Sequence, residues 1–535
     1  MSDIGSVEGV DGVAREVPVL PADLRGLNVR DFLEEAVREV PERPFVITRE
    51  SSLSFAELNA RVDRVAAAWQ SLGLGKGDRV AFMVGNTPDF LVAWLALAKL
   101  GAILVAINTR LKGAEVRAML EIGKAKLMLA DADHLEASRS VAAEIPVVAL
   151  DELIGVARRA GPEFDRPPLA ADDVVSFIFT SGTTGRPKAV MQTHGNFVLT
   201  GQAYPWWLGC QPGTRFYCCL PLFHVNGQAY STMGTIANRG TLILVERFSA
   251  SRFWDDVRIH RANVVNYIGA MIAILNKLEP SPAERDHELR IAYGAPKLPE
   301  DQLRAIEARY GFTLVSGFGM SETTFGLVES LELRPPGTIG RPRLHPDPRL
   351  TNEARVVDED DRDVGPGEVG ELVIRNPMLM KGYFDDPTLT AEALRGGWLH
   401  TGDFASKDAD GYFAFVDRKK DIVRRRGENI SSLEIELTLA DHPAVEESAI
   451  VGVPSELTDE EVLAFVVLGE GKNAEPAELV AFCAERLADH KVPRYLQIVE
   501  ALPKTATQKV EKTRLKSEVA DPSRWYDARA ERDGR

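Results

Sequence analysis

The stretch VVSFIFTSGTTGRPKAV, residues 174–190, joins an apolar run to a loop rich in glycine, hydroxyl side chains and cations. Residues 174–180 are typical of a buried β-strand, because apolar side chains dominate them. The loop leaves this strand at Thr180. Ligands of parallel α/β sheets bind at the carboxyl ends of the strands, so the stretch predicts such a sheet with a binding site at its edge.

The loop itself has the composition of a phosphate-binding loop. Gly182 and Gly185 let backbone N–H groups approach an anion closely, and Lys188 adds a positive charge. The hydroxyl donors of the loop are Ser181, Thr183 and Thr184. A polyphosphate is the ligand that this composition suits, although an ordinary surface turn can have the same residues, so the loop needs partners elsewhere in the chain.

A P-loop nucleotide hydrolase is excluded by two positions. Its signature, GxxxxGK[ST], counted from Gly182, requires glycine at 187 and Ser or Thr at 189. The chain has Pro187, which donates no backbone N–H, and Ala189, which has no hydroxyl for a magnesium ion. If the loop binds a polyphosphate, it does so without the P-loop signature.

The composition of the whole chain is that of an ordinary globular protein with several domains' worth of residues. Its 535 residues are 45% hydrophobic and 27% charged. The formal net charge of −16 argues against nucleic acid or a membrane surface as the main partner, since both are polyanions. The acidic N-terminus does not resemble a secretory signal, so we expect a cytoplasmic protein without stable membrane insertion.

The cysteines and the longest apolar run have plain structural interpretations. The four cysteines, at 210, 218, 219 and 483, form no CxxC pair and are expected to be reduced and buried. Residues 90–107 are apolar but contain Lys99 and Gly101. This run therefore predicts a helix, a glycine turn and a buried strand rather than a membrane helix.

Periodicity along the chain predicts the fold class α/β. Helical and strand patterns alternate from about residue 28 onward, which indicates a large N-terminal body of mostly parallel sheets with helices on both faces. After about residue 350, short strands between Gly, Pro and Asp turns predict a small β-barrel-like subdomain. Residues 417–427 form a charged hinge, and the remainder predicts a small, mobile α+β C-terminal domain.

Seven blocks in order along the chain resemble the signature motifs of the adenylate-forming (AMP-binding) superfamily, in its acyl-CoA synthetase branch. They are FTSGTTGRPKAV at 179, PLFHVNG at 221, YGAP at 293, GFGMSETT at 317, HTGDF at 400, DRKKDIVRRRGENISSLEIE at 417 and PKTATQK at 503. The resemblance covers nearly the whole chain. It implies an N-terminal AMP-binding domain over residues 1–419 and a C-terminal lid domain over residues 420–535.

The resemblance implies an ATP- and Mg²⁺-dependent enzyme that joins a carboxylic acid to AMP, releases pyrophosphate and then transfers the acyl group to coenzyme A. It assigns Glu322 and Thr184 to the magnesium ion, Thr323 to the α-phosphate and Phe318 to adenine. Asp403 is expected to bind the ribose hydroxyls with support from Arg418. The other implied nucleotide-binding positions are Thr180, Ser181, Gly182, Thr183, Lys188, Gly294, Ala295, Pro296, Gly317, Gly319 and Met320.

The same resemblance assigns roles to the C-terminal part. Lys509 matches the family lysine that stabilises negative charge during adenylation, although Gln508 stands where the family commonly has glycine. Lys420 matches the pivot of the domain rotation, and Gly427 the wall of the pantetheine tunnel. The run Arg424–Arg426 can attract the phosphates of CoA or be a solvated basic turn. Two further lysines, Lys504 and Lys512, are expected to be solvated.

The identity of the acid substrate is the part of the function that the sequence determines least. His224 is expected to gate the acyl site, and residues 264–274 contain no acidic side chain for a substrate ammonium group, which favours a hydrophobic acid. The small residues Gly269 and Gly294 are expected to leave room for a bulky or long acid. The candidate acyl contacts are Trp206, Trp207, Ile268, Gly269, Gly294, Gly319 and Phe325.

Several alternatives stay open. The acyl group can go to a carrier-protein phosphopantetheine instead of free CoA, or the chain can be a nucleotide-binding homologue without chemistry. The acid can be fatty, aryl, carnitine-like or polycyclic; the blocks near residues 221 and 266 look most like bacterial ligases of the carnitine and medium-chain type. A homodimer is expected only because two-fold dimers are the commonest oligomers.

Overall fold

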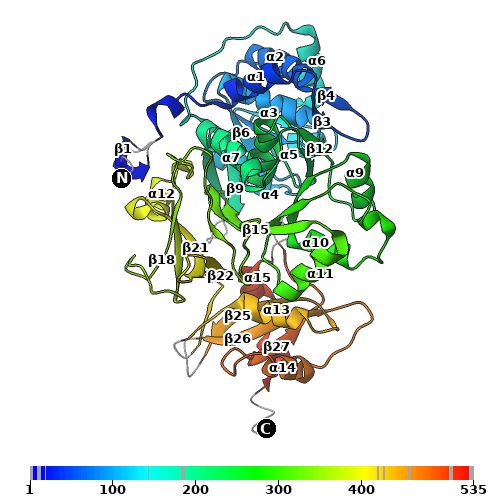
Figure 1. Cartoon of the computed structure of the whole chain (residues 1–535), viewed down its shortest axis with the longest axis vertical. Coiled ribbons are helices and arrows are strands. Elements are labelled where there is room, and N and C mark those ends of the chain that lie inside the picture. The colour runs from blue at the N-terminus through cyan, green and yellow to red at the C-terminus, as the bar shows by residue number, and fades with distance from the viewer. Residues whose placement is uncertain are drawn as a thin grey trace. The chain divides into compact units, whose positions relative to one another are not determined.

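The computed structural model describes residues 4–8, 14–18, 20–142, 144–181, 187–418, 421–425, 428–455, 460–504 and 510–528, and of residues 4–8, 14–18, 181, 424, 428–429 and 518–519 the main chain only. The chain divides into two compact units (Figure 1). The first comprises Met1–Arg355, Val373–His400 and Asp410–Phe413. The second comprises Val356–Leu372, Thr401–Ala409 and Ala414–Arg535.

A seven-stranded sheet in the first unit carries the stretch that opened the sequence analysis. Its order is β20-β10-β9-β6-β5-β7-β8. The five strands from β9 to β8 are parallel, whereas β10 runs antiparallel to both β9 and β20. The bounds are β5 Arg79–Met83, β6 Ile103–Ala106, β7 Leu127–Ala130, β8 Val147–Ala149, β9 Val174–Ser181, β10 Pro187–Thr193 and β20 Gly382–Tyr383.

A nine-stranded sheet forms the other half of this unit, in the order β17-β16-β15-β14-β13-β11-β12-β3-β4. The strands from β15 to β3 are parallel, and antiparallel strands flank them on both sides. The mostly parallel sheets predicted from the sequence are therefore confirmed. The bounds are β3 Pro44–Ile47, β4 Ser52–Ser54, β11 Arg215–Cys218, β12 Thr241–Leu244, β13 Val264–Ile268, β14 Ile291–Ala295, β15 Thr313–Met320, β16 Thr323–Val328 and β17 Arg341–Pro342.

Several helices of the first unit begin at a side-chain cap. α2 starts with a capping box between Ser54 and Glu57, and α3 is capped by Thr87 and ends at the left-handed Gly101. In Figure 1, α1, α2 and α6 lie together near α3. The bounds are α1 Val29–Glu39, α2 Phe55–Ser71, α3 Pro88–Leu100, α4 Ala114–Gly123, α5 Leu135–Val141, α6 Leu150–Arg159, α7 His194–Trp207, α8 Met233–Ala237, α9 Phe253–Ile259, α10 Gly269–Asn276, α11 Glu300–Tyr310 and α12 Pro387–Ala393, with single turns at Ala22–Leu24, Pro282–Glu284 and Arg395–Gly397 and a π-helical turn at Asn226–Thr232.

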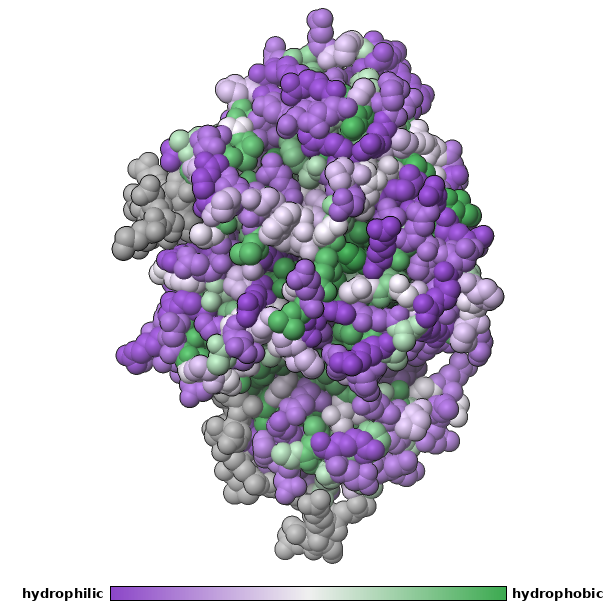
Figure 2. Space-filling view, in the orientation of Figure 1, coloured by the Kyte–Doolittle hydropathy of each residue, from purple (hydrophilic) through white to green (hydrophobic). Residues whose placement is uncertain are grey.

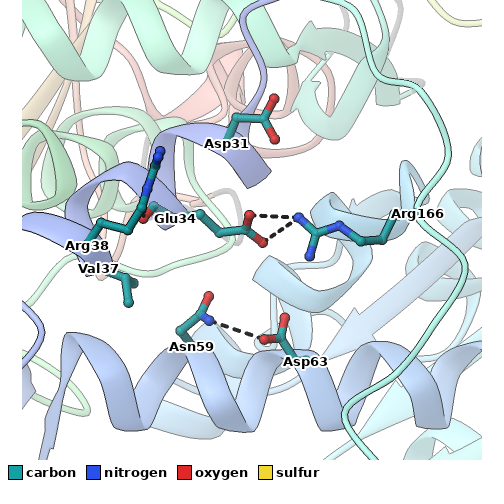
Figure 3. A pocket seen from close by; sticks show the side chains of 7 residues that line it. All are labelled: Asp31, Glu34, Val37, Arg38, Asn59, Asp63 and Arg166. Atoms are coloured by element: carbon teal, nitrogen blue, oxygen red, sulfur yellow. Dashed lines mark hydrogen bonds and ion pairs between the residues drawn. The ribbon is translucent and has the colours of Figure 1, made fainter.

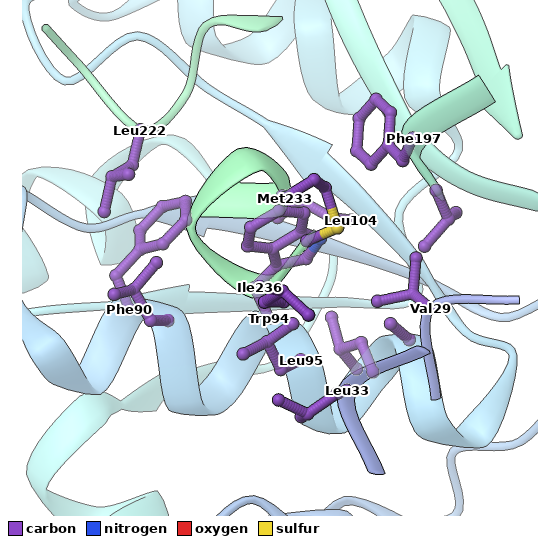
Figure 4. Close-up of a cluster of buried hydrophobic side chains, with 14 of the residues drawn as sticks. Val29, Leu33, Phe90, Trp94, Leu95, Leu104, Phe197, Leu222, Met233 and Ile236 are labelled. Atoms are coloured by element: carbon purple, nitrogen blue, oxygen red, sulfur yellow. The ribbon is translucent and has the colours of Figure 1, made fainter. Parts of the chain in front are cut away.

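The apolar run at residues 90–107 is core. α3 is buried on all sides, and β6 follows it after Gly101, so the predicted helix, turn and strand are confirmed. Figure 4 shows Trp94 of α3 among side chains from α1, α7 and α8. Its ring centre lies 6.5 Å from that of Phe90 and 6.1 Å from that of Phe197. Among the described helices, none has the length and apolar character that crossing a bilayer requires.

A four-stranded sheet, β18-β19-β21-β22, forms the small β-barrel-like subdomain. Its strands coincide with the short polar-flanked strands expected after residue 350. The bounds are β18 Glu353–Val357, β19 Val369–Arg375, β21 Leu399–Lys407 and β22 Phe413–Arg418. The N-terminal pair β1 Ile4–Glu8 and β2 Ala14–Pro18 forms a separate antiparallel ribbon.

The C-terminal part of the second unit is the predicted α+β module. Side chains of its central strands alternate between two apolar clusters: Ile450 and Val462 face α13 and α14, whereas Val451 and Leu463 pack on the opposite side with Leu515. The sheet order is β25-β26-β27-β28. The bounds are β23 Val423–Arg425, β24 Glu428–Ile430, α13 Ser432–Ala440, β25 Val445–Pro454, β26 Glu460–Leu468, α14 Pro476–Ala484, β27 Tyr495–Ile498, α15 Lys512–Arg514, β28 Tyr526–Asp527, and turns at Leu515–Val519 and Pro522–Arg524.

The cysteines agree with the sequence interpretation. All four are free thiols. Cys218, Cys219 and Cys483 are buried, and Cys210 is half-buried. Burial raises the pKa of the Cys210 thiol to about 12 and that of Cys218 to about 11, so both stay protonated at neutral pH.

A buried histidine at the start of α7 makes the stability of the first unit depend on pH. His194 is fully buried, and its Nδ1 accepts a hydrogen bond from the Val29 backbone N–H at 3.1 Å. Burial lowers its pKa to about 4. The unfolded chain binds this proton near pH 6.5, so the free energy of unfolding falls as the pH drops from 6.5 to 4, by up to about 3 kcal/mol.

His194→Gln tests this dependence, because glutamine keeps an acceptor for Val29 N–H but does not titrate. We expect the difference in unfolding free energy between wild type and variant to be constant above pH 7. The wild-type advantage should shrink by about 3 kcal/mol toward pH 4 in urea denaturation curves. A difference that stays constant down to pH 4 would contradict this account.

Candidate functional site

The two strands that flank the predicted phosphate loop, β9 and β10, form an antiparallel β-hairpin. Lys188 pairs with Thr180, and Pro187 with Ser181, across β9 and β10. In a P-loop protein a helix follows the loop and directs its N-terminus at the phosphates. Here strand β10 follows, which confirms that the P-loop class is excluded. The predicted ligands Gly182, Thr183 and Thr184 lie outside the described residues.

Three side chains from separate segments meet beside this hairpin. The Tyr383 hydroxyl donates a hydrogen bond of 2.9 Å to the Glu322 carboxylate, and the Lys188 ammonium nitrogen lies 5.1 Å from the centre of the Tyr383 ring. Burial and the adjacent Glu322 raise the pKa of the Tyr383 hydroxyl, so it keeps its proton and donates. The structure thus brings two predicted site residues together through Tyr383, which the sequence interpretation missed.

The turn that carries Glu322 is held from two further sides. The Gln192 side-chain amide donates to the Ser321 carbonyl oxygen at 2.5 Å, and Gln192 in turn accepts from the Asn196 amide at 3.0 Å. The Met380 backbone N–H donates to the Glu322 carbonyl oxygen at 2.9 Å. Strand β10, helix α7 and the segment before β20 therefore fix this turn between β15 and β16.

The α-phosphate and adenine candidates flank the same turn. Thr323 is the first residue of β16 and is fully buried, with its hydroxyl accepting from the Phe325 backbone N–H at 3.2 Å. Phe318 and Met320 lie half-buried on β15, and Gly319 between them is exposed. The strand that carries the predicted adenine contacts therefore presents part of its surface to solvent.

Gly294 and Gly269 are glycines because their surroundings are crowded. A Cβ atom on Gly294 would lie 2.2 Å from the Tyr267 carbonyl oxygen, and one on Gly269 would lie 2.9 Å from Cδ of Pro296. The expectation that these two positions leave room for a bulky acid is therefore wrong. Ala295 ends β14 directly before Pro296, so this part of the predicted nucleotide site is a strand end.

The other candidate acyl contacts divide into exposed and buried ones. Trp206 is 51% exposed and Ile268 48% exposed. The surface in Figure 2 is mostly hydrophilic, with hydrophobic side chains among the purple ones near its middle. Trp207 and Phe325 are buried, with ring centres 5.1 Å apart. His224 is half-buried, with its ring centre 4.6 Å from that of Phe223.

In the second unit, the two residues predicted for the ribose lie side by side. The Nε atom of Arg418 is 3.8 Å from a carboxylate oxygen of Asp403. The neighbouring Asp417 is buried, and its carboxylate accepts bonds from the backbone N–H and the hydroxyl of Ser432, at 2.6 and 2.8 Å. Asp417 therefore binds the N-terminus of α13, whose N-cap is Ser431, and anchors the strand that carries Arg418.

Two cations of this unit, Arg425 and Lys512, differ from the sequence expectation. Arg425 is buried: its Nε lies 2.7 Å from a carboxylate oxygen of Glu461, and its Nη1 donates to the His490 carbonyl oxygen at 2.7 Å. It is therefore neither solvated nor presented to CoA. Lys512 is half-buried and forms an ion pair of 2.7 Å with Glu436, so the expectation that it is solvated is wrong. Lys504 is exposed, as expected, and its ammonium lies 2.5 Å from a carboxylate oxygen of Glu447. The predicted Lys420, Gly427 and Lys509 lie beyond the described parts of the chain.

Comparison with known protein families agrees with these motifs along most of the chain. Residues 33–384 match the family model of the AMP-binding enzyme, and residues 434–509 match that of the AMP-binding enzyme C-terminal domain. The chain belongs to the AMP-binding enzyme family. Between the two matched segments lie residues 385–433, which contain Asp403, Arg418 and the predicted hinge.

Curated relatives of this AMP-binding enzyme include two crotonobetaine/carnitine–CoA ligases. The protein from Salmonella arizonae is 35% identical over 485 residues, which are 86% of this chain and 93% of the relative. The protein from Citrobacter koseri is 33% identical over 519 residues, which are 92% of this chain and 99% of the relative.

Solved structures give the same fold. The o-succinylbenzoate CoA synthetase MenE from Bacillus subtilis, in complex with its acyl-adenylate, superimposes with a TM-score of 0.83 at 28% identity, covering 91% of this chain and 98% of that one. ATP-bound MatB from Rhodopseudomonas palustris gives a TM-score of 0.83 at 27% identity, covering 92% and 99%. The α/β architecture with a small C-terminal α+β domain is therefore that of its family.

The AMP-binding family implies a magnesium ion, and Glu322 fits it. Magnesium is usually held by one or two carboxylates and completes its shell with phosphate oxygens and water. Glu322 is a buried carboxylate whose orientation is fixed by the bond from Tyr383 to its Oε1. The described residues contain no group of three acidic, histidine or cysteine side chains, so an ion in this part of the protein would depend on the nucleotide for most of its ligands.

A surface pocket on the first unit has a structural explanation. It has a volume of about 470 Å³ and lies between α1, α2 and the chain near Arg166 (Figure 3). Its charges satisfy one another: Arg166 donates to both oxygens of Glu34, and the buried Lys99 ammonium donates to Glu34, Asn59 and Asp63. None of the predicted site residues lines this pocket, which is lined by Asp31, Glu34, Val37, Arg38, Asn59, Asp63 and Arg166.

Arg425→Met tests the structural role of Arg425. The change leaves the Glu461 carboxylate, only 1% exposed, without its closest cation, which costs about 3 kcal/mol of local stability. We expect faster hydrogen exchange in β25 and β26, measured by mass spectrometry. Replacing Glu461 as well, in Arg425→Met/Glu461→Leu, should restore most of the protection, because no charge then stays buried alone.

The exposed Arg486 supplies the control. Arg486→Met should leave exchange in β25 and β26 as in the wild type, within about 0.5 kcal/mol. Wild-type hydrogen exchange in Arg425→Met, together with a raised KM for CoA, would contradict the structural role and indicate instead that Arg425 binds CoA.

Proposed function

We propose that this chain activates a hydrophobic carboxylic acid as an acyl-adenylate and transfers the acyl group to coenzyme A. At the level of its family, the chain is an AMP-forming acid–CoA ligase that uses ATP with Mg²⁺. The observation that carries the finer proposal is the contact of Lys188, Tyr383 and Glu322 beside the β9–β10 hairpin. It provides a cation for phosphate and a carboxylate for magnesium on either side of Tyr383.

In the first half-reaction, an oxygen of the acid attacks the α-phosphorus of ATP. A new O–P bond forms as the bond to pyrophosphate breaks, and pyrophosphate leaves. We assign Lys188, with Thr180 to Thr184, to the departing phosphates and Thr323 to the α-phosphate. Glu322, with Thr184, would hold the magnesium ion, which neutralises phosphate charge when bound. The rigid turn around Glu322 supports this assignment, since preorganised groups stabilise charge best.

The nucleoside end of ATP is assigned to residues of its own in each unit. We assign adenine to a position against Phe318, lined by the ends of β14 and β15, and ribose to Asp403 with Arg418. The Asp403–Arg418 distance of 3.8 Å supports this pair. The other residues that we assign to the nucleotide are Gly294, Ala295, Pro296, Gly317, Gly319 and Met320.

For the second half-reaction, we assign domain alternation to the boundary between residues 419 and 420. In this proposal Lys509 stabilises charge during adenylation, and rotation about Lys420 then brings Gly427 to the path of the CoA thiol. The thiol sulfur attacks the acyl carbonyl, a thioester forms, and AMP leaves. With Arg425 paired to Glu461, the CoA phosphates would depend on its neighbours in the basic run.

The acid is proposed to enter past His224. The known relatives act on different acids: crotonobetaine or carnitine, o-succinylbenzoate, and anthranilate in the ligase AuaEII. Family membership therefore leaves the acid to be decided by this chain's own side chains. Trp207 and Phe325 provide a buried apolar surface, which suits a hydrophobic acid.

Lys509→Ala separates the two half-reactions. We expect acid-dependent pyrophosphate release to fall by at least a hundredfold, because the charge on the reacting phosphate loses its stabilising cation. Transfer from supplied acyl-AMP to CoA should survive. Lys504→Ala is the control and should leave both steps unchanged, since Lys504 is paired with Glu447. Equal loss of both half-reactions in Lys509→Ala would contradict the proposal.

Tyr383→Phe tests whether the hydrogen bond from Tyr383 to Glu322 supports magnesium binding. Phenylalanine keeps the ring below Lys188 but removes the donor to Glu322, a charge-assisted bond worth about 1.5–3 kcal/mol. We expect the Mg²⁺ concentration for half-maximal pyrophosphate release to rise about tenfold. Tyr310→Phe is the matched control: the Tyr310 hydroxyl is buried and donates no bond to the described residues, so its loss should leave the Mg²⁺ requirement unchanged. An unchanged Mg²⁺ requirement in Tyr383→Phe would refute this link.

A further inference from the structure

Arg343 is a buried cation among the candidate acyl contacts. Its side chain has no exposed surface. The guanidinium carbon lies 4.5 Å from the ring centre of Trp207, 5.3 Å from that of Tyr230 and 5.6 Å from that of Tyr293. Three aromatic rings thus surround one positive charge, at distances typical of cation–π contacts.

Neutral acceptors hold this guanidinium in place. Its Nε donates to the Leu327 carbonyl oxygen at 3.1 Å, and its Nη1 donates at 2.6 Å to both the Tyr230 hydroxyl and the Thr324 carbonyl oxygen. Its Nη2 donates to the Tyr293 hydroxyl. Four of the five N–H groups are therefore used. No ion pair joins Arg343 to an acidic side chain of the described residues, so its charge is not neutralised there.

One residue of this group, and neighbours of the others, were assigned to the acid on separate grounds. Trp207 is a candidate acyl contact, and Thr324 directly precedes another, Phe325. A Cβ atom on Gly317 would lie 2.8 Å from Nη2 of Arg343, and one on Gly319 would lie 3.0 Å from the Tyr230 hydroxyl. Arg343 and its rings therefore pack directly against the strand that is proposed to hold adenylate and acyl group.

An aromatic cage of this kind is the usual protein site for a quaternary ammonium group. We propose that Arg343 is a specificity-determining residue: it fills the cage with the chain's own cation and thereby restricts the reaction to acids without a cationic group. This inference rests on the proposed function and on the acyl contacts assigned there.

Two physical effects act against a cationic acid at this position. The guanidinium repels a second positive charge, and the repulsion is strong because the surroundings are buried and apolar. An ammonium group that displaced Arg343 from the rings would also break its four hydrogen bonds. A neutral group meets neither penalty. The relatives named for crotonobetaine and carnitine take acids that carry a trimethylammonium group, so the proposal separates this chain from them by substrate.

A pair of isosteric acids tests the proposal. 4-(Trimethylammonio)butyrate and 5,5-dimethylhexanoate have the same shape and differ only in a quaternary nitrogen in place of a quaternary carbon. We expect the wild-type enzyme to release pyrophosphate with the neutral acid at a kcat/KM at least tenfold higher than with the cationic acid. Comparable values for the two acids would overturn the proposal.

Variants of Arg343 identify the cause of the preference. Arg343→Met removes the charge at similar volume and should reduce the preference at least tenfold, whereas Arg343→Lys keeps the charge and should keep the preference. Arg341→Met is the matched control, since Arg341 is exposed and contacts Tyr412 instead of the cage. It should leave the preference unchanged. Thermal unfolding of each variant shows whether it is folded.

The outcomes separate this inference from the proposed function. An enzyme that activates the neutral acid, but whose preference is the same in Arg343→Met, refutes the role of Arg343 and leaves the ligase function intact. If Arg343→Met does not fold, the role of Arg343 is tested by Arg343→Lys and by the ratio of the two wild-type kcat/KM values. Loss of the preference in a folded Arg343→Lys also refutes the role. Failure to release pyrophosphate with any acid of a broad panel refutes the proposed function itself.

Discussion

The two-residue turn between β15 and β16 is the constraint on which the proposed chemistry depends. Ser321 is held by Gln192, and Glu322 by Tyr383 and the Met380 N–H. These contacts come from segments far apart in the sequence, so the turn is fixed only when the first unit is complete. A carboxylate that is oriented before the substrate binds needs no reorganisation during the reaction.

Three buried cations of the described residues have two kinds of environment. Lys99 and Arg425 have carboxylate partners, and their positions are explained by the elements that they join. Arg343 instead has aromatic rings, hydroxyls and carbonyl oxygens around it. A buried charge without an acid is costly, and one that is kept beside a predicted substrate site points to a role in selecting the substrate.

The sequence predicts the elements better than the contacts between them. The parallel sheets, the apolar helix before Gly101 and the α+β module follow from periodicity and capping, which act over a few residues. The seven motifs single out Lys188 and Glu322, which the structure brings to either side of Tyr383, and Asp403, which lies beside Arg418.

The sequence interpretation fails where a residue's role depends on a tertiary contact. Tyr383 lies 61 residues from Glu322, and nothing in its local pattern distinguishes it from a core tyrosine. Arg425 looks like part of a basic turn, yet its partner Glu461 stands in another strand. Gly294 suggests open space, whereas Tyr267 of the neighbouring strand already occupies it. In each case the residue type indicates the role only once its neighbour in the folded structure is known.

The central claim is that this chain joins an acid to AMP before coenzyme A takes part. Exchange of labelled pyrophosphate into ATP, measured without coenzyme A and with a neutral hydrophobic acid present, tests it most directly. The account predicts exchange that requires the acid and Mg²⁺ and does not require coenzyme A. Exchange that appears only when coenzyme A is added, or its absence with every acid of a broad panel, would contradict the account.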